Sequence, residues 1–180
     1  MSFRKEKKFR LTFSDQKEMK NSLISLGMKS LFPSRNINSA YFDTDHLDMF
    51  TDSEEGILPR KKIRVRWYDN EKILKKETKV SSIEGRYKLS EIFISNNFLN
   101  NFKSTLLDCN YGLIRPILIV SYSREYFLLN NLRITFDNNI NYRDLRSTIY
   151  KPLFDEECVV EIKTPKNISD DYIESIIKHS

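Results

Sequence analysis

Residues 60–68, RKKIRVRWY, carry a cation at every second position and could bind an anion. One parity of the segment holds Arg60, Lys62, Arg64, Arg66 and Tyr68, and the other holds Lys61, Ile63, Val65 and Trp67. Side chains of a β-strand point to alternate faces, so the segment predicts a basic row on one face and a mostly apolar row on the other. Arginine binds phosphate in bidentate fashion and lysine binds it as a point charge, so a phosphate-rich anion is the ligand to expect.

Similar alternation recurs in other segments that predict strands. Charged residues of one parity occur at Lys8 and Arg10, at Arg86 and Lys88, and at Arg133. A glutamate stands two residues before a lysine in three strands, at Glu6/Lys8, Glu77/Lys79 and Glu161/Lys163. The strand that holds Arg124 is the least regular, because Tyr122 and Tyr126 share the face of the arginine. For any single strand, a solvated face is the ordinary interpretation.

Taken together, the strands favour a bound polyanion over a solvated face. The polar positions are concentrated in arginine and lysine, whereas a solvated face also mixes in Ser, Thr, Asn and Gln. Like charges opposite one another across a sheet repel. Each such pair costs on the order of 4 kcal/mol at about 4 Å and an effective dielectric of about 20. A ligand with several negative charges would offset that repulsion.

The elements that must position these residues are mostly strands. Alternation and turn residues predict strands over 5–13, 36–43, 61–69, 72–80, 85–92, 116–128, 131–138 and 157–164. Helices are expected over 14–27, 96–108 and 169–179, with Ser14 as N-cap and Gly27 as C-terminal stop of the first helix. A tight turn is expected at Asn130-Asn131. The pattern predicts a mainly β (α+β) class with an antiparallel sheet that can close into a barrel.

Length and composition set the context for this sheet. The 180 residues fit one domain, 1–180, and the net charge of +5 favours an anionic partner. No apolar run approaches the ~20 residues of a membrane span, and the basic N-terminus lacks the apolar region of a signal peptide. Cys109 and Cys158 show no disulfide framework. These features predict a soluble, cytoplasmic domain without a membrane segment.

Several other kinds of site are not indicated. The four glycines are isolated, so side chains, and not a glycine-rich loop, must bind phosphate. His46 and His179 are too few and, even with the two cysteines, lack the spacing of a zinc site. Residues 41–50, YFDTDHLDMF, lack the spacing of a calcium loop. They predict a strand end followed by a turn that Asp43 or Asp45 caps.

Seven segments of this chain, in order, resemble the VTC domain: EKKFRL, YFDTDHLDMF, KIRVRWY, KETK with GRYKLS, SYSREYF, LRITFD and VVEIKT. That is the polyphosphate polymerase domain of the vacuolar transporter chaperone family, within the CYTH-like triphosphate tunnel metalloenzyme superfamily. The resemblance covers residues 6–164 and implies an antiparallel, eight-stranded tunnel barrel with flanking helices. In that family the tunnel takes ATP and lengthens polyphosphate by transfer of the γ-phosphoryl group, assisted by Mn²⁺ or Mg²⁺.

The resemblance also implies roles for individual residues. The cations expected to carry the reaction are Arg64, Arg66, Lys79, Arg124 and Arg133. Further substrate contacts are expected from Lys8, Lys88, Lys163 and Arg10. Glu161 matches the glutamate that holds the divalent metal, while Glu6 and Glu77 are either second metal contacts or partners that keep nearby lysines charged. From the residues alone, Glu161 and Lys163 could equally be a cross-strand pair.

Three functions remain open from the sequence. An ATP-dependent polyphosphate polymerase is favoured over a tunnel-type hydrolase of inorganic or nucleoside triphosphate and over a non-catalytic polyphosphate-binding module. The family has a further strand after VVEIK, whereas Lys178 lies in a helical pattern, so we expect a barrel that is incomplete at its C-terminal end. Nucleic acid is disfavoured because the aromatic residues beside the basic row predict core packing. A membrane-protein partner is compatible with the family, and the oligomeric state stays open.

Overall fold

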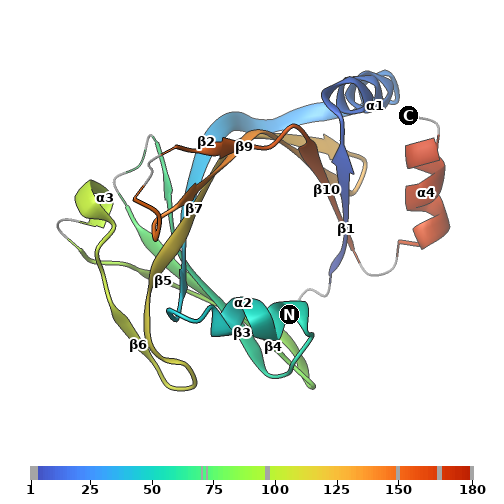
Figure 1. The fold of residues 1–180 in the computed structure, drawn as a ribbon. Helices are drawn as coiled ribbons and strands as arrows, with labels where there is room; N and C mark the ends of the chain where they lie inside the picture. The colour runs from blue at the N-terminus through green and yellow to red at the C-terminus, as the bar shows by residue number, and fades with distance from the viewer. Residues whose placement is uncertain are drawn as a thin grey trace. The chain divides into compact units, whose positions relative to one another are not determined.

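The structure is a computed structural model that describes residues 4–69, 71, 73–95, 98–148, 151–165 and 168–178 (Figure 1). The described residues form ten strands: β1 (Arg4–Leu11), β2 (Lys29–Asp43), β3 (Arg60–Tyr68), β4 (Lys75–Ser82), β5 (Gly85–Ile92), β6 (Leu106–Asp108), β7 (Gly112–Leu129), β8 (Leu132–Asp144), β9 (Leu153–Phe154) and β10 (Cys158–Pro165). They also form four helices: α1 (Phe13–Ser25), α2 (Asp48–Glu54), α3 (Phe98–Asn101) and α4 (Asp170–Lys178).

Hydrogen bonding joins eight of the strands in the order β1-β10-β8-β7-β2-β3-β4-β5, with β6 beside β7 and β9 beside β8. The pairs β1/β10, β10/β8, β2/β3, β3/β4 and β4/β5 are all antiparallel. The predicted turn at Asn130-Asn131 joins β7 to β8, and Asn130 has the positive φ of 51° that a tight turn requires. The predicted mainly β class, with an antiparallel sheet and flanking helices, is confirmed.

Two compact units make up the chain. Unit 1 comprises Met1–Asn36, Tyr122–Ile140 and Phe154–Ser180, and unit 2 comprises Ile37–Ser121 and Asn141–Leu153. Strands β2, β7 and β8 contribute residues to both units. Each unit has its own apolar core. The single-domain organisation expected over 1–180 stays a prediction.

The core of unit 1 forms between helices and the apolar side of β8 and β10. Met19 and Leu23 of α1 and Ile173 of α4 are buried together with Phe136 of β8 and Val160 of β10. Figure 1 shows both helices on the same side of β1 and β10. Burial of these side chains removes apolar surface from water, which is the main stabilising contribution to such a core.

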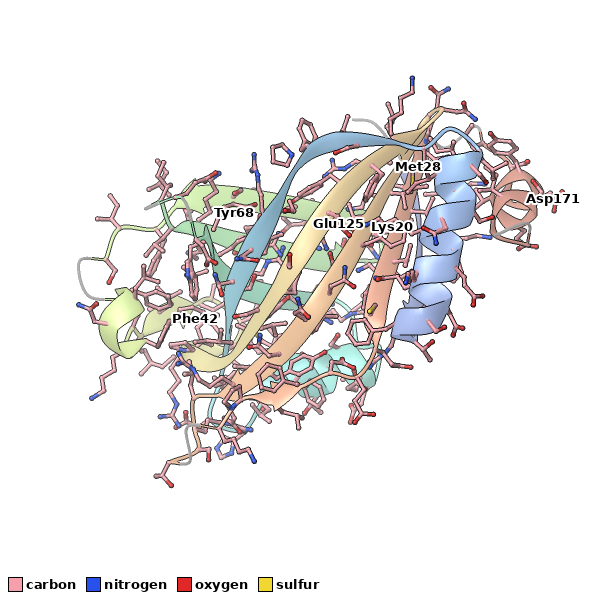
Figure 2. All side chains as sticks on the ribbon, turned by 90° about the horizontal axis from the view of Figure 1, so that it is seen from above. Lys20, Met28, Phe42, Tyr68, Glu125 and Asp171 are labelled. Carbon is pink, nitrogen blue, oxygen red and sulfur yellow. The ribbon has the colours of Figure 1, made fainter. Side chains whose placement is uncertain are left out.

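An ion pair fixes the direction of the β7 side chains in unit 1. Lys20 of α1 and Glu125 of β7 lie beside each other (Figure 2), with Lys20 Nζ at 2.7 and 2.8 Å from the two carboxylate oxygens. Glu125 therefore points to the side that carries α1. Side chains alternate along a strand, so Arg124 points to the other side.

Aromatic rings dominate the core of unit 2. Phe98 is fully buried, and the rings of Phe42, Phe93 and Phe102 lie between 5.2 and 6.1 Å from it. Trp67 of β3 meets the Phe98 ring edge-on at 6.4 Å. The expectation that Trp67 packs in the core is thereby confirmed.

The helix predicted over 96–108 is wrong. Of the described residues in this range, 98–108, only Phe98–Asn101 is helical, and Leu106–Asp108 forms β6 beside β7. Phe98 and Phe102 both pack into the aromatic core, and Phe102 has a left-handed backbone conformation with φ of 53°. That conformation cannot continue a right-handed helix, so α3 ends after one turn.

The ends of the other helices differ in detail from the prediction. Thr12, not Ser14, caps α1, because its hydroxyl accepts a hydrogen bond from Asp15 N at 3.2 Å. Asp43 is confirmed as a cap, since its carboxylate accepts from Met49 N and Phe50 N at 2.9 Å each. The segment that it caps is the helix α2, where only a turn was predicted.

The boundaries of several strands also differ from those predicted from the sequence. The strand predicted over 36–43 begins earlier, at Lys29, and the strands predicted over 116–128 and 131–138 are longer, as β7 and β8. The predicted strand start at Lys72 and the predicted helix end at His179 lie outside the described residues. None of the helices in the described part of the chain is both long and apolar enough to span a membrane.

Candidate active site

One face of β3, β4 and β5 in unit 2 is strongly basic. The register places Arg66 opposite Lys75, Arg64 opposite Glu77 and Lys62 opposite Lys79. On the next strand, Lys88 lies opposite Lys79 and Arg86 lies opposite Ser81. We call this surface the basic face. Its charged residues are eight cations and one carboxylate: Arg60, Lys62, Arg64, Arg66, Lys75, Lys79, Arg86, Lys88 and Glu77.

A row of three lysines crosses the basic face. Lys62, Lys79 and Lys88 lie directly opposite one another on adjacent strands, and the row contains no carboxylate. Like charges in opposed positions destabilise a strand pair. Glu77, which accepts a hydrogen bond from Lys88, compensates part of this charge, and a bound anion would compensate more.

Glu77 is the shared partner of the central cations. Its carboxylate accepts hydrogen bonds from Arg64 Nε at 2.7 Å and from Lys88 Nζ, and it lies 4.0 Å from Arg66. Burial raises the pKa of Glu77, but the hydrogen bonds and charges of Lys88, Arg64 and Arg66 outweigh burial and lower this pKa to about 2. Glu77 is therefore ionised at neutral pH and holds the cations in place.

Strand β2 orients the two arginines further. Tyr41 lies opposite Arg64, and its hydroxyl accepts a hydrogen bond from Arg64 Nη1 at 3.0 Å. Ser39 lies opposite Arg66, and its hydroxyl accepts from Arg66 Nε at 3.2 Å. Each guanidinium is thus fixed by neighbouring strands before any ligand binds, which limits the entropy lost on binding.

In unit 1, two glutamates and two lysines form one cluster across β1 and β10. Lys8 Nζ lies 3.2 Å from Glu6 and 3.5 Å from Glu161, and Lys163 Nζ lies 3.5 and 3.3 Å from the same two carboxylates. The register creates the cluster, because Glu6 is opposite Lys163 and Lys8 is opposite Glu161. Cross-strand pairing, one of the two interpretations left open by the sequence, is therefore present.

The two carboxylates of this cluster also contact each other. A side-chain hydrogen bond with Glu161, with the charges of Lys163 and Lys8, lowers the pKa of Glu6 to about 2, although burial acts in the opposite direction. Burial lowers the pKa of Lys8, but the charges of Glu161 and Glu6 outweigh it and raise that pKa. Glu6 and Lys8 are therefore both held in their charged forms.

Arg124 extends the cluster from β7. Its Nε and Nη2 donate to the two carboxylate oxygens of Asp137 at 2.6 Å each, and its Nη1 lies 3.9 Å from Glu161. Burial lowers the pKa of Arg124, but Asp137, Tyr122 and Glu161 outweigh burial and raise this pKa above its ordinary value. A bidentate pair of this kind fixes the plane of the guanidinium.

Two polar atoms of this face, both on β8, lack partners among the described residues. Arg133 lies opposite Lys163, and Thr135 lies opposite Glu161. Arg133 Nε and Thr135 Oγ1 are buried and have no hydrogen-bond partner among the described residues. A buried polar group without a partner is costly, so this position has capacity for a ligand. We call the whole surface the mixed-charge face: Glu6, Lys8, Arg124, Arg133, Thr135, Asp137, Glu161 and Lys163.

The family is decided by a match over almost the whole chain. The family model of the VTC domain matches residues 3–180. This chain belongs to the VTC domain family. A search of the curated proteins finds no match.

Solved structures share the fold of this VTC domain. The protein bh2851 from Bacillus halodurans, described as a candidate adenylate cyclase, is 13% identical with a TM-score of 0.59, covering 96% of this chain and 84% of its own. HpAC1 from Hippeastrum, described as a candidate adenylyl cyclase with a dominant triphosphatase activity, is 12% identical with a TM-score of 0.55 over 96% and 83%. PH1012 from Pyrococcus horikoshii OT3 is 19% identical with a TM-score of 0.52 over 98% and 87%. The family that the resemblance implies is thus confirmed, and its fold is shared with these solved structures.

The mixed-charge face of the VTC domain fits a divalent metal better than the basic face does. Mg²⁺ is commonly held by one or two carboxylates together with phosphate oxygens of the substrate. Glu6 and Glu161 are a contacting pair of this kind. Glu77, by contrast, is surrounded by Arg64, Arg66 and Lys88. In the described parts of the chain no three His, Cys, Asp or Glu side chains gather as a metal site, so substrate oxygens would have to complete the coordination.

Most of the predicted residues fall into one of the two faces. Unit 2 brings together Arg64, Arg66, Lys79, Lys88 and Glu77, and unit 1 brings together Lys8, Lys163, Glu6, Glu161, Arg124 and Arg133. Arg10 pairs instead with Asp155 and Glu157, ahead of β10. The predicted convergence of both sets on one tunnel stays a prediction.

Three residues of the site were missed by sequence analysis. Tyr41 and Ser39 lie on β2, where no charged pattern marks them, and only the β2/β3 register shows that they contact the arginines. Asp137 has the same parity as Arg133, and this pattern could have indicated that both side chains lie on the same face of β8. Its pairing with Arg124 depends on the position of β7 beside β8.

Proposed function

We propose that this VTC domain is an ATP-dependent polyphosphate polymerase, a phosphotransferase that adds the γ-phosphoryl group of ATP to a polyphosphate chain with Mn²⁺ or Mg²⁺. The observation that carries the proposal is the basic face, where eight cations surround a single carboxylate. Membership of the VTC domain family supports the same chemistry. A chain of phosphates is a ligand that would neutralise this face.

Phosphoryl transfer needs positioned charge more than it needs a covalent catalyst. Arg64 and Arg66 are already oriented by Glu77, Tyr41 and Ser39. Donors held in advance stabilise developing charge without reorganising during the reaction. We therefore assign to these arginines the binding of the triphosphate of ATP.

The mixed-charge face would serve the metal and a neighbouring phosphate. Bound by Glu161 and Glu6, a divalent cation would neutralise charge on phosphate oxygens. Lys8 and Lys163 lie within 3.5 Å of both carboxylates, and their charges favour the ionised form of Glu6. Arg133 would donate from its unpartnered Nε to a phosphate oxygen.

The acceptor phosphate is itself the nucleophile, so the reaction needs no nucleophilic side chain. The terminal phosphate of polyphosphate carries its own negative oxygen and attacks the γ-phosphorus of ATP directly, and ADP leaves. The serines of the basic face, Ser39, Ser81 and Ser90, are therefore not needed as nucleophiles.

Incubation of the purified protein with ATP and Mn²⁺ tests the proposal, with products separated on a gel and phosphate release measured in parallel. Growth of a chain sensitive to a polyphosphatase is the expected result. Binding of polyphosphate with neither chain growth nor phosphate release would overturn the assignment as an enzyme and leave a binding module.

A triphosphate hydrolase is the second candidate. The observation in its favour is the fold shared with HpAC1, which is described as having a dominant triphosphatase activity. Phosphate release from tripolyphosphate or ATP without chain growth would identify this function. Since water would then replace the polyphosphate acceptor, added polyphosphate should not speed the consumption of ATP.

A further inference from the structure

A cavity of about 510 Å³ lies in unit 2 beside α3 and the segment that follows it. Its lining includes three cations, Lys103, Arg115 and Arg143, and two hydroxyl residues, Ser104 and Thr105. None of the described residues that line it is acidic. The volume is in the range of small-molecule sites, and the charge selects an anion.

This cavity lies on the side of β3 opposite the basic face. Phe102 lines it, and the Phe102 ring packs 5.9 Å from Trp67. Trp67 follows Arg66 on β3, so the two side chains point to opposite faces. The phosphate contacts assigned to Arg64 and Arg66 therefore cannot account for the cations of this cavity.

Arg143 is the central cation. Its guanidinium lies over the Phe102 ring, 4.7 Å from the centroid, which is a cation–π contact. Its Nε is buried and finds no hydrogen-bond acceptor among the residues that the structure describes. Buried donors normally have a partner, so this guanidinium donor suits an acceptor oxygen of a bound ligand.

The backbone supports this placement of the ring. Phe102 adopts a left-handed conformation, φ 53°, which is unfavourable for a residue with a side chain. Trp67 and Phe98 pack against the Phe102 ring and hold it in place. The aromatic platform under Arg143 is thus fixed by the core of unit 2.

Arg115 is only partly neutralised. Its Nε lies 2.6 Å from Asp45, and both side chains are more than half exposed. Exposed ion pairs contribute little to stability, so a more strongly charged ligand can compete for the arginine. The lining thus holds three cations, with Asp45 as the exposed partner of Arg115, and suits an anion with several negative charges.

We propose that this cavity, the Arg143 pocket, binds a compact phosphate anion of the inorganic pyrophosphate type. Arginine forks match phosphate oxygens in bidentate geometry, and hydroxyl groups such as those of Ser104 and Thr105 can donate to the remaining oxygens. The site does not depend on the proposed function, because its residues belong to neither charged face.

The only tryptophan of the chain provides the readout. Trp67 packs on Phe102, so pyrophosphate in the Arg143 pocket should change its fluorescence. Metal-free titration with pyrophosphate, followed by fluorescence and by calorimetry, is expected to give a saturable signal. The Arg64→Ala variant should keep this fluorescence signal, because Arg64 points to the other face.

Arg143→Gln should weaken the fluorescence titration about tenfold or more, since the bidentate donor is lost, and should leave turnover unchanged. Arg35→Gln, which removes an equal charge from an exposed position of β2, should titrate like the parent. If Arg143→Gln fails to fold, judged by circular dichroism, the exposed pair Lys103→Gln and Arg115→Gln replaces it with the same expected loss. The proposal would be overturned if these variants titrated like the parent. It would also be overturned if the parent showed no fluorescence change and no heat of binding.

Discussion

The charged faces of the two units combine similar residues in opposite proportions. The mixed-charge face sets three carboxylates among four cations, and its register puts Glu6 opposite Lys163 and Glu161 opposite Lys8. The basic face sets one carboxylate among eight cations, and its register puts lysine opposite lysine. The first face compensates most of its own charge, whereas the second keeps a large excess of positive charge that suits an external anion. We infer that unit 2 supplies most of the phosphate affinity and unit 1 the response to metal.

The largest expected effect comes from removing an oriented arginine of the basic face. Arg64→Ala should lower turnover by about 10²–10³-fold, because a donor fixed by Glu77 and Tyr41 is lost, and Arg66→Ala should behave alike. Initial rates of ATP consumption measure the effect, with circular dichroism to confirm folding. Arg146→Ala, an exposed arginine paired with Asp144, is the control and should keep full activity. Normal turnover in the Arg64 and Arg66 variants would show that the basic face is not the site.

The next largest effect is expected on the free energy of unfolding and on its dependence on pH. Glu77→Gln should cost about 3 kcal/mol of unfolding free energy at neutral pH, because a buried carboxylate that pairs with three cations is lost. The pKa of Glu77, about 2, lies below its ordinary value of 4.5. Its contribution is therefore complete above the ordinary value and disappears as the pH falls toward the lowered one.

Urea unfolding at about pH 7, 4 and 3 measures this contribution. The difference between parent and Glu77→Gln should shrink at each step downward. Glu91→Gln is the matched control, because Glu91 pairs with Lys76 on the other face of the same strands and is exposed. A difference that stays constant across this pH range would contradict the assignment of Glu77 as an ionised partner of the arginines.

A smaller effect is expected on the metal requirement, which should change when the mixed-charge face is altered and the basic face is left intact. Glu161→Gln should raise the Mn²⁺ concentration for half-maximal activity by about tenfold, because one of two carboxylate ligands is lost. Binding of tripolyphosphate without metal should change little, since the basic face is intact. Glu157→Gln, which affects a partner of Arg10, is the control. An unchanged metal requirement in Glu161→Gln would assign that carboxylate to ion pairing alone.

The smallest expected effect is on stability, and it tests whether the lysine row of the basic face is destabilising without a ligand. Lys79→Gln should raise the unfolding free energy by about 0.5 kcal/mol at low salt, because it removes a charge from between Lys62 and Lys88. The same variant should bind tripolyphosphate more weakly and with a shallower salt dependence. Denaturant unfolding with and without tripolyphosphate measures both changes. A loss of stability in the ligand-free variant would mean that the lysine row is already compensated.

The alternation of charge along single strands was enough to predict much of the site. Arg64, Arg66 and Lys79 were placed on one face because the period of a strand is two residues, and β3 and β4 follow that period closely. Alternation along one strand says nothing of which strand lies alongside. The contacts of Tyr41 with Arg64 and of Asp137 with Arg124 depend on strand order and register, which single-strand patterns do not contain.

Packing in the core explains the main error in the fold. Residues 96–108 have helical spacing of apolar side chains, but Phe98 and Phe102 are both drawn into one aromatic cluster, and Phe102 leaves the helical region. Tertiary contacts thus overrode local propensity. The Arg143 pocket lies beside this irregular segment, so it could not be predicted from a pattern of regular elements.

The division of unit 1 into three separate stretches of chain has a consequence for synthesis. Val160 and Ile162 of β10 complete a core whose first members, Met19 and Leu23, lie near the N-terminus. Nascent chains shorter than about 160 residues would leave the apolar side of α1 only partly covered, by β7 and β8, and contacts this distant in sequence form slowly. Ribosome-bound intermediates of this length should therefore recruit chaperones that recognise exposed apolar surface.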